Sequence, residues 1–372
     1  MSGTSADAID AVVVRLGREP HEIELVGAYE EPLEDELRAR IHALVQGAVP
    51  LRELLALDAL LGERFAAAAL GAARAAGVRL EDVRGIASHG QTVAHYPEAA
   101  VHNTLQIGSA ALIHARTGRP VVSDFRRADM AAGGQGAPLT PFFHFHRFAD
   151  TKERRAVLNV GGFTNVSYLP NRDPAHVIAF DPGPGNALLD RAARWASGGA
   201  DRYDRDGARA ARGRVVRELV EEWLTDPYFQ RPPPKSTGHE HFGEAFFARA
   251  RDAVLLRGGA PDDLFASLAE LTVESVARAA ERFFPQPAER WILCGGGARN
   301  PELRRRLAAR VAPAQLDTTD AHGVPSDALE AIAFAVLGHC ASRGEPSNLP
   351  AATGASRAVC LGTVTPPDSF RS

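Results

Sequence analysis

The 372 residues include 42 basic and 46 acidic side chains, giving a formal net charge of −4, and 45% of the residues are hydrophobic. A chain of this length and composition can bury a large core, and two domains are favoured over one. The weak net charge excludes the strong positive field that nucleic-acid binding or attraction to anionic lipid requires.

Strand and helix patterns alternate in the first part of the chain. Residues 11–16 alternate in polarity as a strand does, and residues 21–28 predict a second strand. The pattern continues with helices at 34–46 and 51–76, a short buried strand at 83–88, a turn and helix within 103–118, and a strand at 120–123.

A glycine-rich passage, Gly133 to Pro138, follows these elements and predicts a flexible domain boundary. We expect an N-terminal lobe of residues 1–127 plus 348–372 and a C-terminal lobe of residues 128–347. The final strand-like run, residues 358–362, would return to the first lobe.

Residues 156–169 are typical of a strand, a polar glycine turn and a second strand. The same design occupies residues 2–16, so the pattern predicts a duplication in which two such hairpins grip one ligand. Helical periodicity resumes at 187–195, 208–224, 244–256, 261–283 and 328–341.

Asp181 is the most informative residue, because it follows an apolar strand and begins the turn Asp181-Pro182-Gly183-Pro184-Gly185-Asn186. A carboxylate on such a turn can act as a general base or hold a metal. The alternative is a helix cap before Asn186, although capping does not need the preceding glycines.

Three glycine turns are candidate phosphate-binding loops, because glycine lets backbone N–H groups converge on an anion. Each one alone is also compatible with a plain hairpin turn. No Walker-type or dinucleotide-binding glycine motif stands in the required context, which argues against a P-loop or Rossmann site. The turns are Gly3-Thr4-Ser5, Gly161-Gly162-Phe163-Thr164 and Gly183-Pro184-Gly185.

Other polar residues leave two interpretations open. Glu330 could bind a sugar hydroxyl or favour a helix N-terminus through the macrodipole, and Lys235 is a candidate anion contact. Arg126, Asp129 and Gln135 could contact substrate, or form a solvated ion pair. The His-x-His pairs at 144–146 and 239–241 lack the third ligand of a zinc site.

Several blocks, taken in order along the chain, resemble the signature motifs of the anhydro-N-acetylmuramic acid kinase family. The motifs cover nearly the whole chain in the family's order, so they are more specific than any single turn. They are residues 1–10, Ser88-His89-Gly90-Gln91-Thr92, 105–108, 124–126, 133–139, 159–162, 180–186, 233–238, Gly295-Gly296-Gly297 with Asn300, and 327–331.

This resemblance implies an α/β fold of two actin-like ATPase lobes, ribonuclease H-like duplicated halves with an interdomain cleft. It implies an enzyme of cell-wall recycling that uses water and ATP to convert 1,6-anhydro-N-acetylmuramic acid to N-acetylmuramic acid 6-phosphate. Asp181 would activate the water. His89, Gln91, Arg126, Gln135 and Glu330 would bind the sugar, and Asp7 would hold Mg²⁺. ATP would contact Gly3, Thr4, Ser5, Ala6, Asp7, Ala8, Ile9, Asp10, Gly161, Gly162, Gly183, Gly185, Asn186, Gly295, Gly296 and Gly297.

The sequence departs from the resemblance in two places. Family members carry a short strand ahead of the Met-Ser-Gly-Thr-Ser block, whereas this sequence opens at Met1, so we expect a missing first strand or an upstream start. Ala8 stands where glycine is usual, which a turn tolerates if φ is negative.

The partners we expect are the anhydro sugar, ATP and water, with neither nucleic acid nor membrane, and the resemblance adds a homodimer. Three widely spaced cysteines, with no apolar span or export signal, favour the cytoplasm. The alternatives are a kinase of the same fold acting on another sugar and an inactive sugar- or nucleotide-binding homologue.

Overall fold

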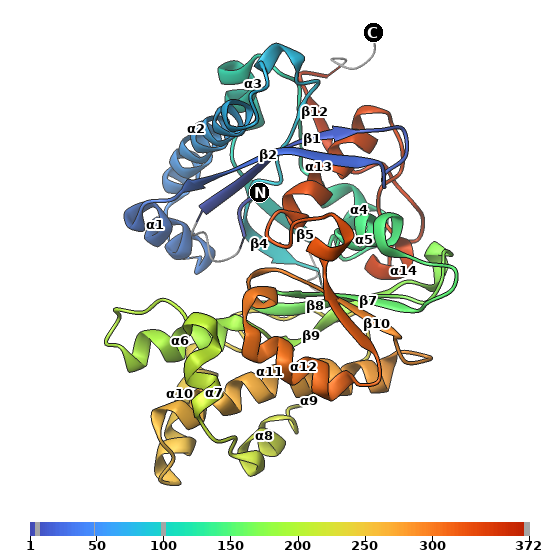
Figure 1. Cartoon of the computed structure of the whole chain (residues 1–372). Helices are drawn as coiled ribbons and strands as arrows, with labels where there is room; N and C mark the ends of the chain where they lie inside the picture. The colour runs from blue at the N-terminus through green and yellow to red at the C-terminus, as the bar shows by residue number, and fades with distance from the viewer. Residues whose placement is uncertain (4–7, 48, 98–101, 368–372) are drawn as a thin grey trace. The chain divides into compact units, whose positions relative to one another are not determined.

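The computed structural model describes residues 1–3, 8–47, 49–97 and 102–367. The chain forms two compact units, Met1–Arg147 with Ala328–Ser372, and Phe148–Asp327 (Figure 1). The boundaries that we expected near residues 127 and 348 lie inside the first unit, because the helix α13 (Leu329–Ser342) packs on four of its strands. The glycine-rich passage at 133–138 therefore lies within a unit.

The second unit is built on one five-stranded sheet. Its order is β11-β10-β7-β8-β9, with β8 antiparallel to both neighbours and the other strands parallel to one another. This is the strand order of a ribonuclease H-like fold, and β7 is its central strand. The strands are β7 (Arg155–Val160), β8 (Phe163–Leu169), β9 (Ile178–Pro184), β10 (Arg290–Cys294) and β11 (Gln315–Thr318).

Helices bury the apolar faces of this sheet. The helix α11 (Pro261–Phe283) is buried along most of its length and packs against β9 and five helices. The run 208–224, expected as one helix, is divided at Gly213, where a Cβ would lie 1.9 Å from the Asp262 carbonyl oxygen. The remaining helices are α6 (Asn186–Ala196), α7 (Ala208–Arg212), α8 (Arg217–Trp223), α9 (Pro227–Gln230), α10 (Glu244–Leu256) and α12 (Pro301–Val311).

The described residues of the first unit form three small sheets. β1 and β2 form an antiparallel hairpin, β4 and β5 form another, and β6 pairs with β3 in parallel and with β12 in antiparallel orientation. The strand expected at 358–362 is instead β12, a few residues later. The strands are β1 (Ala8–Leu16), β2 (Ile23–Pro32), β3 (Ile86–Ala87), β4 (Gln91–Tyr96), β5 (Asn103–Ile107), β6 (Val121–Ser123) and β12 (Thr363–Thr365).

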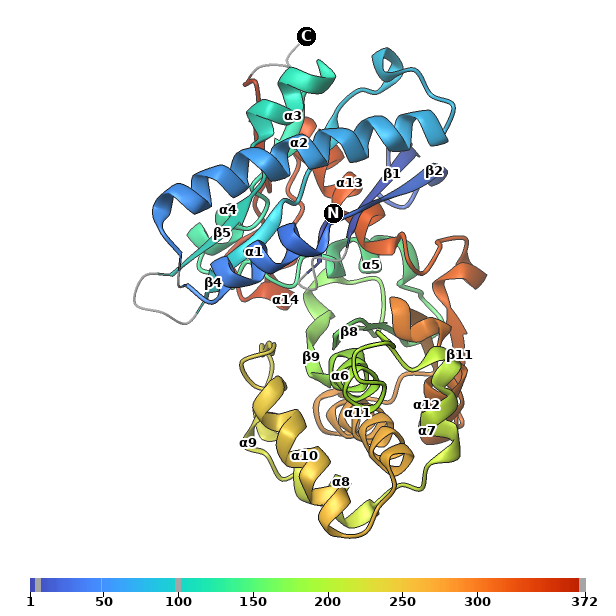
Figure 2. The ribbon, with the colours of Figure 1, turned by 90° about the vertical axis from the view of Figure 1, so that its left-hand side faces the viewer.

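The long helix α2 (Leu51–Ala75) covers the β1–β2 hairpin and packs against α3 (Figure 2). Its alanine-rich face buries Ala68, Ala72 and Ala73, and these small side chains permit close approach to the strands. The other helices of this unit are α1 (Asp35–Val45), α3 (Ala110–Thr117), α4 (Arg127–Ala131), α5 (Pro141–Phe148, ending at the boundary) and α14 (Pro350–Thr353).

Asp129 anchors the glycine-rich passage to the end of the chain. Its side chain is fully buried. One carboxylate oxygen accepts hydrogen bonds from Asn348 and the Thr353 hydroxyl, both at 2.7 Å, and the other accepts from the Gly136 amide at 2.8 Å. This carboxylate holds the loop in place through bonds within the protein, and its role in reading substrate stays a prediction.

Replacing Asp129 by asparagine is expected to lower the free energy of unfolding by about 2–4 kcal/mol, because an amide group would then face buried donors. Urea denaturation measures the change. The exposed Asp201→Asn variant is the control and should differ from the parent by less than about 0.5 kcal/mol. Equal stability of the two variants would contradict this role.

Candidate active site

Asp181 lies within strand β9 rather than at its end, because the strand continues through the proline–glycine run to Pro184. The backbone of Asp181 is bonded to helix α9 and the loop that follows it: its amide donates to the Lys235 carbonyl at 3.0 Å, and its carbonyl accepts from the Tyr228 hydroxyl at 2.6 Å. The side chain accepts from the Thr237 amide at 3.1 Å. These three bonds fix the position of the carboxylate, and the capping interpretation fails because Gly185 is the N-cap residue of α6.

Burial raises the pKa of Asp181 to about 7, against the opposing effects of the Thr237 hydrogen bond and the Lys235 charge. The carboxylate is thus poised to exchange a proton near neutral pH. A base is most effective when its pKa lies near the working pH, and a buried acid with a strongly shifted pKa is a candidate functional group.

Lys235 does not extend toward solvent as an anion contact would. Its side chain is buried, its Nζ donates to the Tyr228 carbonyl at 3.2 Å, and Nζ lies 4.7 Å from the centre of the Tyr228 ring and 5.0 Å from that of Phe283. Burial lowers its pKa to about 8. The aromatic rings and the carbonyl offset the desolvation of the ammonium. Its positive charge favours the ionised form of Asp181.

Three glycine segments of the second unit meet at one end of the sheet. The turn between β7 and β8 supplies Gly161 and Gly162, whose carbonyls accept from the amides of Gly185, Asn186 and Ala187 at 2.8–3.0 Å. The loop after β10 supplies Gly295 to Gly297, and a Cβ on Gly297 would lie 2.3 Å from the Val160 side chain. These three segments therefore lie together within this unit, whereas the Gly3 turn, also predicted to bind phosphate, belongs to the first unit.

The glycines at this end of the sheet differ in what they face. At Gly295, which has a φ of +75°, an added Cβ would lie 2.2 Å from the Asn159 side chain. At Gly185 it would lie 2.4 Å from the Gly161 carbonyl oxygen. At Gly161, Gly162 and Gly296 the nearest atom would be 3.6, 3.8 and 3.9 Å away. The first two positions need glycine for packing, whereas at the last three an added Cβ would make only ordinary van der Waals contacts.

The amide of Gly183 donates to the Thr164 hydroxyl at 3.1 Å, and the Asn186 side chain donates to the Val160 carbonyl at 3.1 Å. These predicted phosphate contacts are engaged inside the protein. Open backbone at Gly161, Gly162 and Gly296 fits an anion better, since a phosphate can approach it without meeting a side chain.

In the first unit, the structure brings Arg126, His89 and Glu330 together. Arg126 donates to His89 Nε2 through Nε at 3.0 Å, lies 2.8 Å from it through Nη2, and donates to the Gly136 carbonyl through Nη1 at 2.8 Å. Burial lowers the pKa of Arg126 to about 10 and raises that of Glu330, with the two charges stabilising each other. His89 accepts through Nε2, so its Nδ1 carries the proton and donates to Gly90.

Gln91 is tied to the start of the chain: its amide oxygen accepts from the Ser2 hydroxyl at 2.7 Å and its nitrogen donates to the Gly3 carbonyl at 3.3 Å. The backbone amide of Gln135 donates to the Thr353 carbonyl at 2.8 Å. Ala8, Ile9 and Asp10 begin strand β1. The predicted contacts Thr4, Ser5, Ala6 and Asp7 lie outside the described residues.

Sequence reasoning missed Tyr228, in helix α9, and Thr237, in the loop after it, which bond Asp181 from about fifty residues away along the chain. The proline-rich block ending at Gly238 was a signal, but it does not show which atoms face the carboxylate. Within residues 1–3, 8–47, 49–97 and 102–367, no group of three or more His, Cys, Asp or Glu side chains could hold a metal.

Comparison with known proteins gives a consistent result. Residues 1–367 match the family described as anhydro-N-acetylmuramic acid kinase. The chain is 43% identical over 373 residues to the anhydro-N-acetylmuramic acid kinase of Gloeobacter violaceus, covering 98% of this chain and 97% of the relative. It is 46% identical over 369 residues to that of Xanthomonas campestris pv. campestris, covering 98% and 96%.

Among solved structures, the chain is similar to component A of (R)-2-hydroxyglutaryl-CoA dehydratase from Acidaminococcus fermentans, at 12% identity and a TM-score of 0.44 over 88% of this chain and 96% of that one. None of the helices in the described ranges is long and apolar enough to span a membrane.

Proposed function

Because the chain belongs to the anhydro-N-acetylmuramic acid kinase family, we propose that Asp181 drives water addition and phosphorylation at a single oxygen of the sugar. The enzyme is a phosphotransferase that uses ATP, and its reaction yields N-acetylmuramic acid 6-phosphate for murein recycling. The alternatives, another sugar or an inactive binding protein, are not favoured by these relatives.

One base is sufficient for the chemical step. Asp181 accepts a proton from water as the water oxygen bonds C1 of the anhydro sugar, and the C1–O6 bond breaks. O6 then bonds the γ-phosphorus of ATP, and ADP leaves. Glycosidases usually need a second carboxyl group to protonate the leaving oxygen. Here the leaving oxygen gains phosphorus instead, so one carboxylate suffices.

The observation that carries this proposal is the partly buried carboxylate of Asp181, with its raised pKa, in the same unit as the loosely packed glycine backbone at Gly161, Gly162 and Gly296. Gly161, Gly162 and Gly296 would bind ATP phosphates through backbone N–H groups. Mg²⁺, which keeps several waters and needs few protein ligands, would neutralise phosphate charge when bound.

The assignment of His89, Gln91, Arg126, Gln135 and Glu330 to the sugar remains a prediction. The Arg126 guanidinium supports it, because two of its nitrogens bond His89 and a third bonds Gly136, which fixes the orientation of a charge suited to a carboxylate. We also propose a cytoplasmic location, since the reaction consumes ATP.

The pH dependence of kcat/KM is expected to rise with pH and level off above about pH 7, because Asp181 must be deprotonated to accept a proton. Replacing Lys235 by methionine removes a charge that favours the carboxylate, so the rise should move to higher pH. Initial rates of ADP release across pH 5 to 9, in parent and variant, measure both. A rise that stays in place in the variant would mean that another group titrates.

The function itself is tested by mass spectrometry of the product formed from the anhydro sugar and magnesium-ATP. We expect a ring-opened monophosphate in equal amount to ADP. N-acetylmuramic acid, which has no 1,6-anhydro ring, is the control. It should be a poor acceptor if opening of that ring and phosphorylation are coupled. A phosphorylated product that keeps the anhydro ring would contradict the proposal.

A further inference from the structure

His89 and Arg126 follow the ends of two neighbouring parallel strands of the first unit. The Ser88 amide extends the pairing of β3 with β6 by donating to the Val122 carbonyl at 2.8 Å. Parallel strands bring their carboxyl ends to the same edge of a sheet, which is where ligands bind in open α/β sheets. The two side chains meet at this edge.

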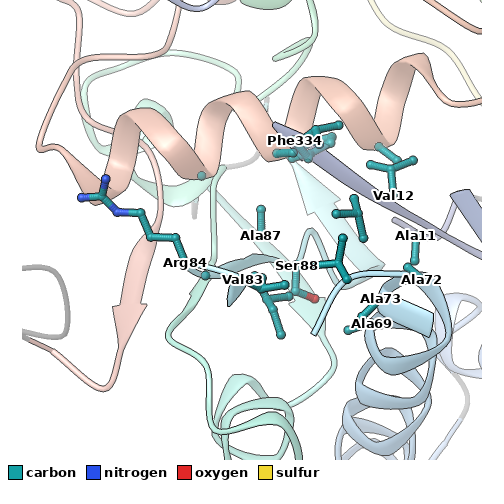
Figure 3. A pocket seen from close by; sticks show the side chains of 18 of the residues that line it. Ala11, Val12, Ala69, Ala72, Ala73, Val83, Arg84, Ala87, Ser88 and Phe334 are labelled. Atoms are coloured by element: carbon teal, nitrogen blue, oxygen red, sulfur yellow. The ribbon is translucent and has the colours of Figure 1, made fainter. Parts of the chain in front are cut away.

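The imidazole of His89 is enclosed by the protein. The residue is 4% exposed, and the centre of its ring lies 4.6 Å from that of Phe334 on α13. Phe334 and Ser88, the residue before His89, line one pocket of the first unit (Figure 3). The ring therefore lies between the helix and the end of β3, and this packing limits its movement.

Both ring nitrogens of His89 bond the protein. A guanidinium can only donate, so Nε2 accepts from Arg126, with Nε at 3.0 Å and Nη2 at 2.8 Å. The proton of the neutral ring is then on Nδ1, which donates to the Gly90 carbonyl at 2.9 Å. Burial, together with the Arg126 charge, lowers the pKa of His89 well below its ordinary value and keeps the ring neutral. Neither nitrogen of this ring is left to bond a sugar.

The two groups that bond Arg126 orient its guanidinium without neutralising it. His89 Nε2 and the Gly136 carbonyl, 2.8 Å from Nη1, are both uncharged acceptors. These bonds use three of the five guanidinium N–H groups. One N–H on each terminal nitrogen has no hydrogen-bond partner in the part of the chain that the structure describes, and a carboxylate can accept from both. Glu330 favours the charged guanidinium electrostatically.

We propose that His89 makes no contact with the sugar and is a positioning residue, whose neutral imidazole holds the Arg126 guanidinium in the orientation that binds the carboxylate of the anhydro sugar. This inference rests on the proposed function and changes the predicted role of His89. An acidic side chain at this position would orient the guanidinium but cancel its charge. A charge that is oriented and not cancelled favours an anionic sugar over a neutral one.

The test measures kcat/KM for two sugars, 1,6-anhydro-N-acetylmuramic acid and 1,6-anhydro-N-acetylglucosamine, which keeps the bicyclic ring and lacks the carboxylate. Replacing His89 by phenylalanine keeps a ring against Phe334 and removes the acceptor. We expect kcat/KM for the acidic sugar to fall about 10- to 100-fold, mainly through KM. The value for the neutral sugar should stay within about twofold of the parent's.

Three further variants separate positioning from packing. His89→Gln should recover most of the loss, because its side-chain oxygen can accept from the guanidinium. His89→Asn is too short to reach it and should behave as His89→Phe does, which keeps the test open if the phenylalanine variant does not fold. His114→Phe is the matched control, since His114 bonds the Arg119 carbonyl at 2.9 Å, and it should change neither sugar.

A double variant tests whether the two residues act as one unit. Arg126→Gln should lose at least as much as His89→Phe with the acidic sugar, and the double variant should lose no more than Arg126→Gln alone. Losses that multiply in the double variant would overturn the proposal. Equal losses for the two sugars in His89→Phe would also overturn it.

Calorimetric titration of both sugars keeps this result separate from the proposed function. The parent should bind the acidic sugar more tightly than the neutral one, and His89→Phe should lose that preference. If this holds while the parent forms no ring-opened monophosphate, the proposed function fails and the role of His89 stands. A parent without preference for the acidic sugar would overturn the role of His89, whatever its activity.

Discussion

Replacing Asp181 by asparagine is expected to lower kcat by a factor of about 10²–10⁴, because the water that attacks C1 then has no base. The asparagine oxygen can still accept from the Thr237 amide, so the local backbone should hold. ATP and sugar affinities, measured by calorimetry, should change little. An unchanged kcat would rule out Asp181 as the base.

The same variant is expected to be more stable than the parent above neutral pH, although it is less active. Burial raises the folded-state pKa of Asp181 to about 7 from its ordinary value of 3.8, so the folded protein binds a proton between these pH values that the unfolded chain has released. This group therefore lowers stability as pH rises through the window. At pH 8 the asparagine variant should be more stable than the parent by on the order of 1–3 kcal/mol, and at pH 4 the two should be alike.

Thermal unfolding of both proteins at the two pH values separates this explanation from general damage. A variant that is inactive because it is misfolded would be less stable at both. A gain in stability at pH 8 together with lost turnover is characteristic of a group held in an unfavourable environment for catalysis.

Replacing Gly295 by alanine is expected to lower the free energy of unfolding by about 2–5 kcal/mol. The residue has φ +75°, which costs an L-residue about 1–2 kcal/mol. The added Cβ would lie 2.2 Å from Asn159 Oδ1 and 3.1 Å from the Val160 backbone, and overpacking of this kind costs about 1–3 kcal/mol. Guanidinium denaturation measures the change.

Gly296→Ala is the matched control, because a Cβ added at this next residue would make only an ordinary van der Waals contact, with Asn186 Nδ2 at 3.9 Å. We expect its free energy of unfolding to stay within about 0.5 kcal/mol of the parent's. Its KM for ATP should rise, since the methyl group would occupy space given to phosphate. Equal destabilisation of both variants would contradict the distinction between packed and open glycines.

Most secondary elements of the second unit could be predicted because their strands are short apolar runs between glycine turns. The β7–β8 hairpin at Gly161 and Gly162 is one example. The division between units was harder, because α13 follows the second unit in sequence yet packs on β1, β3 and β6. Such long-range packing leaves no local signal in the chain.

The candidate site shows the same limit. Asp181 could be identified from its turn, but its raised pKa depends on burial, and the groups that oppose it, the Thr237 amide and the Lys235 charge, lie on a distant loop. Asp129 and Lys235 look like surface ligand contacts in sequence, because charged residues are seldom buried. In the structure each is buried with its partners, which a single sequence does not show.

The central claim is that water attacks the anomeric carbon while O6 takes the phosphoryl group, and one measurement tests it directly. The reaction is run in ¹⁸O-labelled water with unlabelled magnesium-ATP, and the position of the label in the sugar phosphate is read by tandem mass spectrometry. We predict one ¹⁸O at C1 and none in the phosphate on O6. Label in the phosphate, or none at C1, would contradict the account.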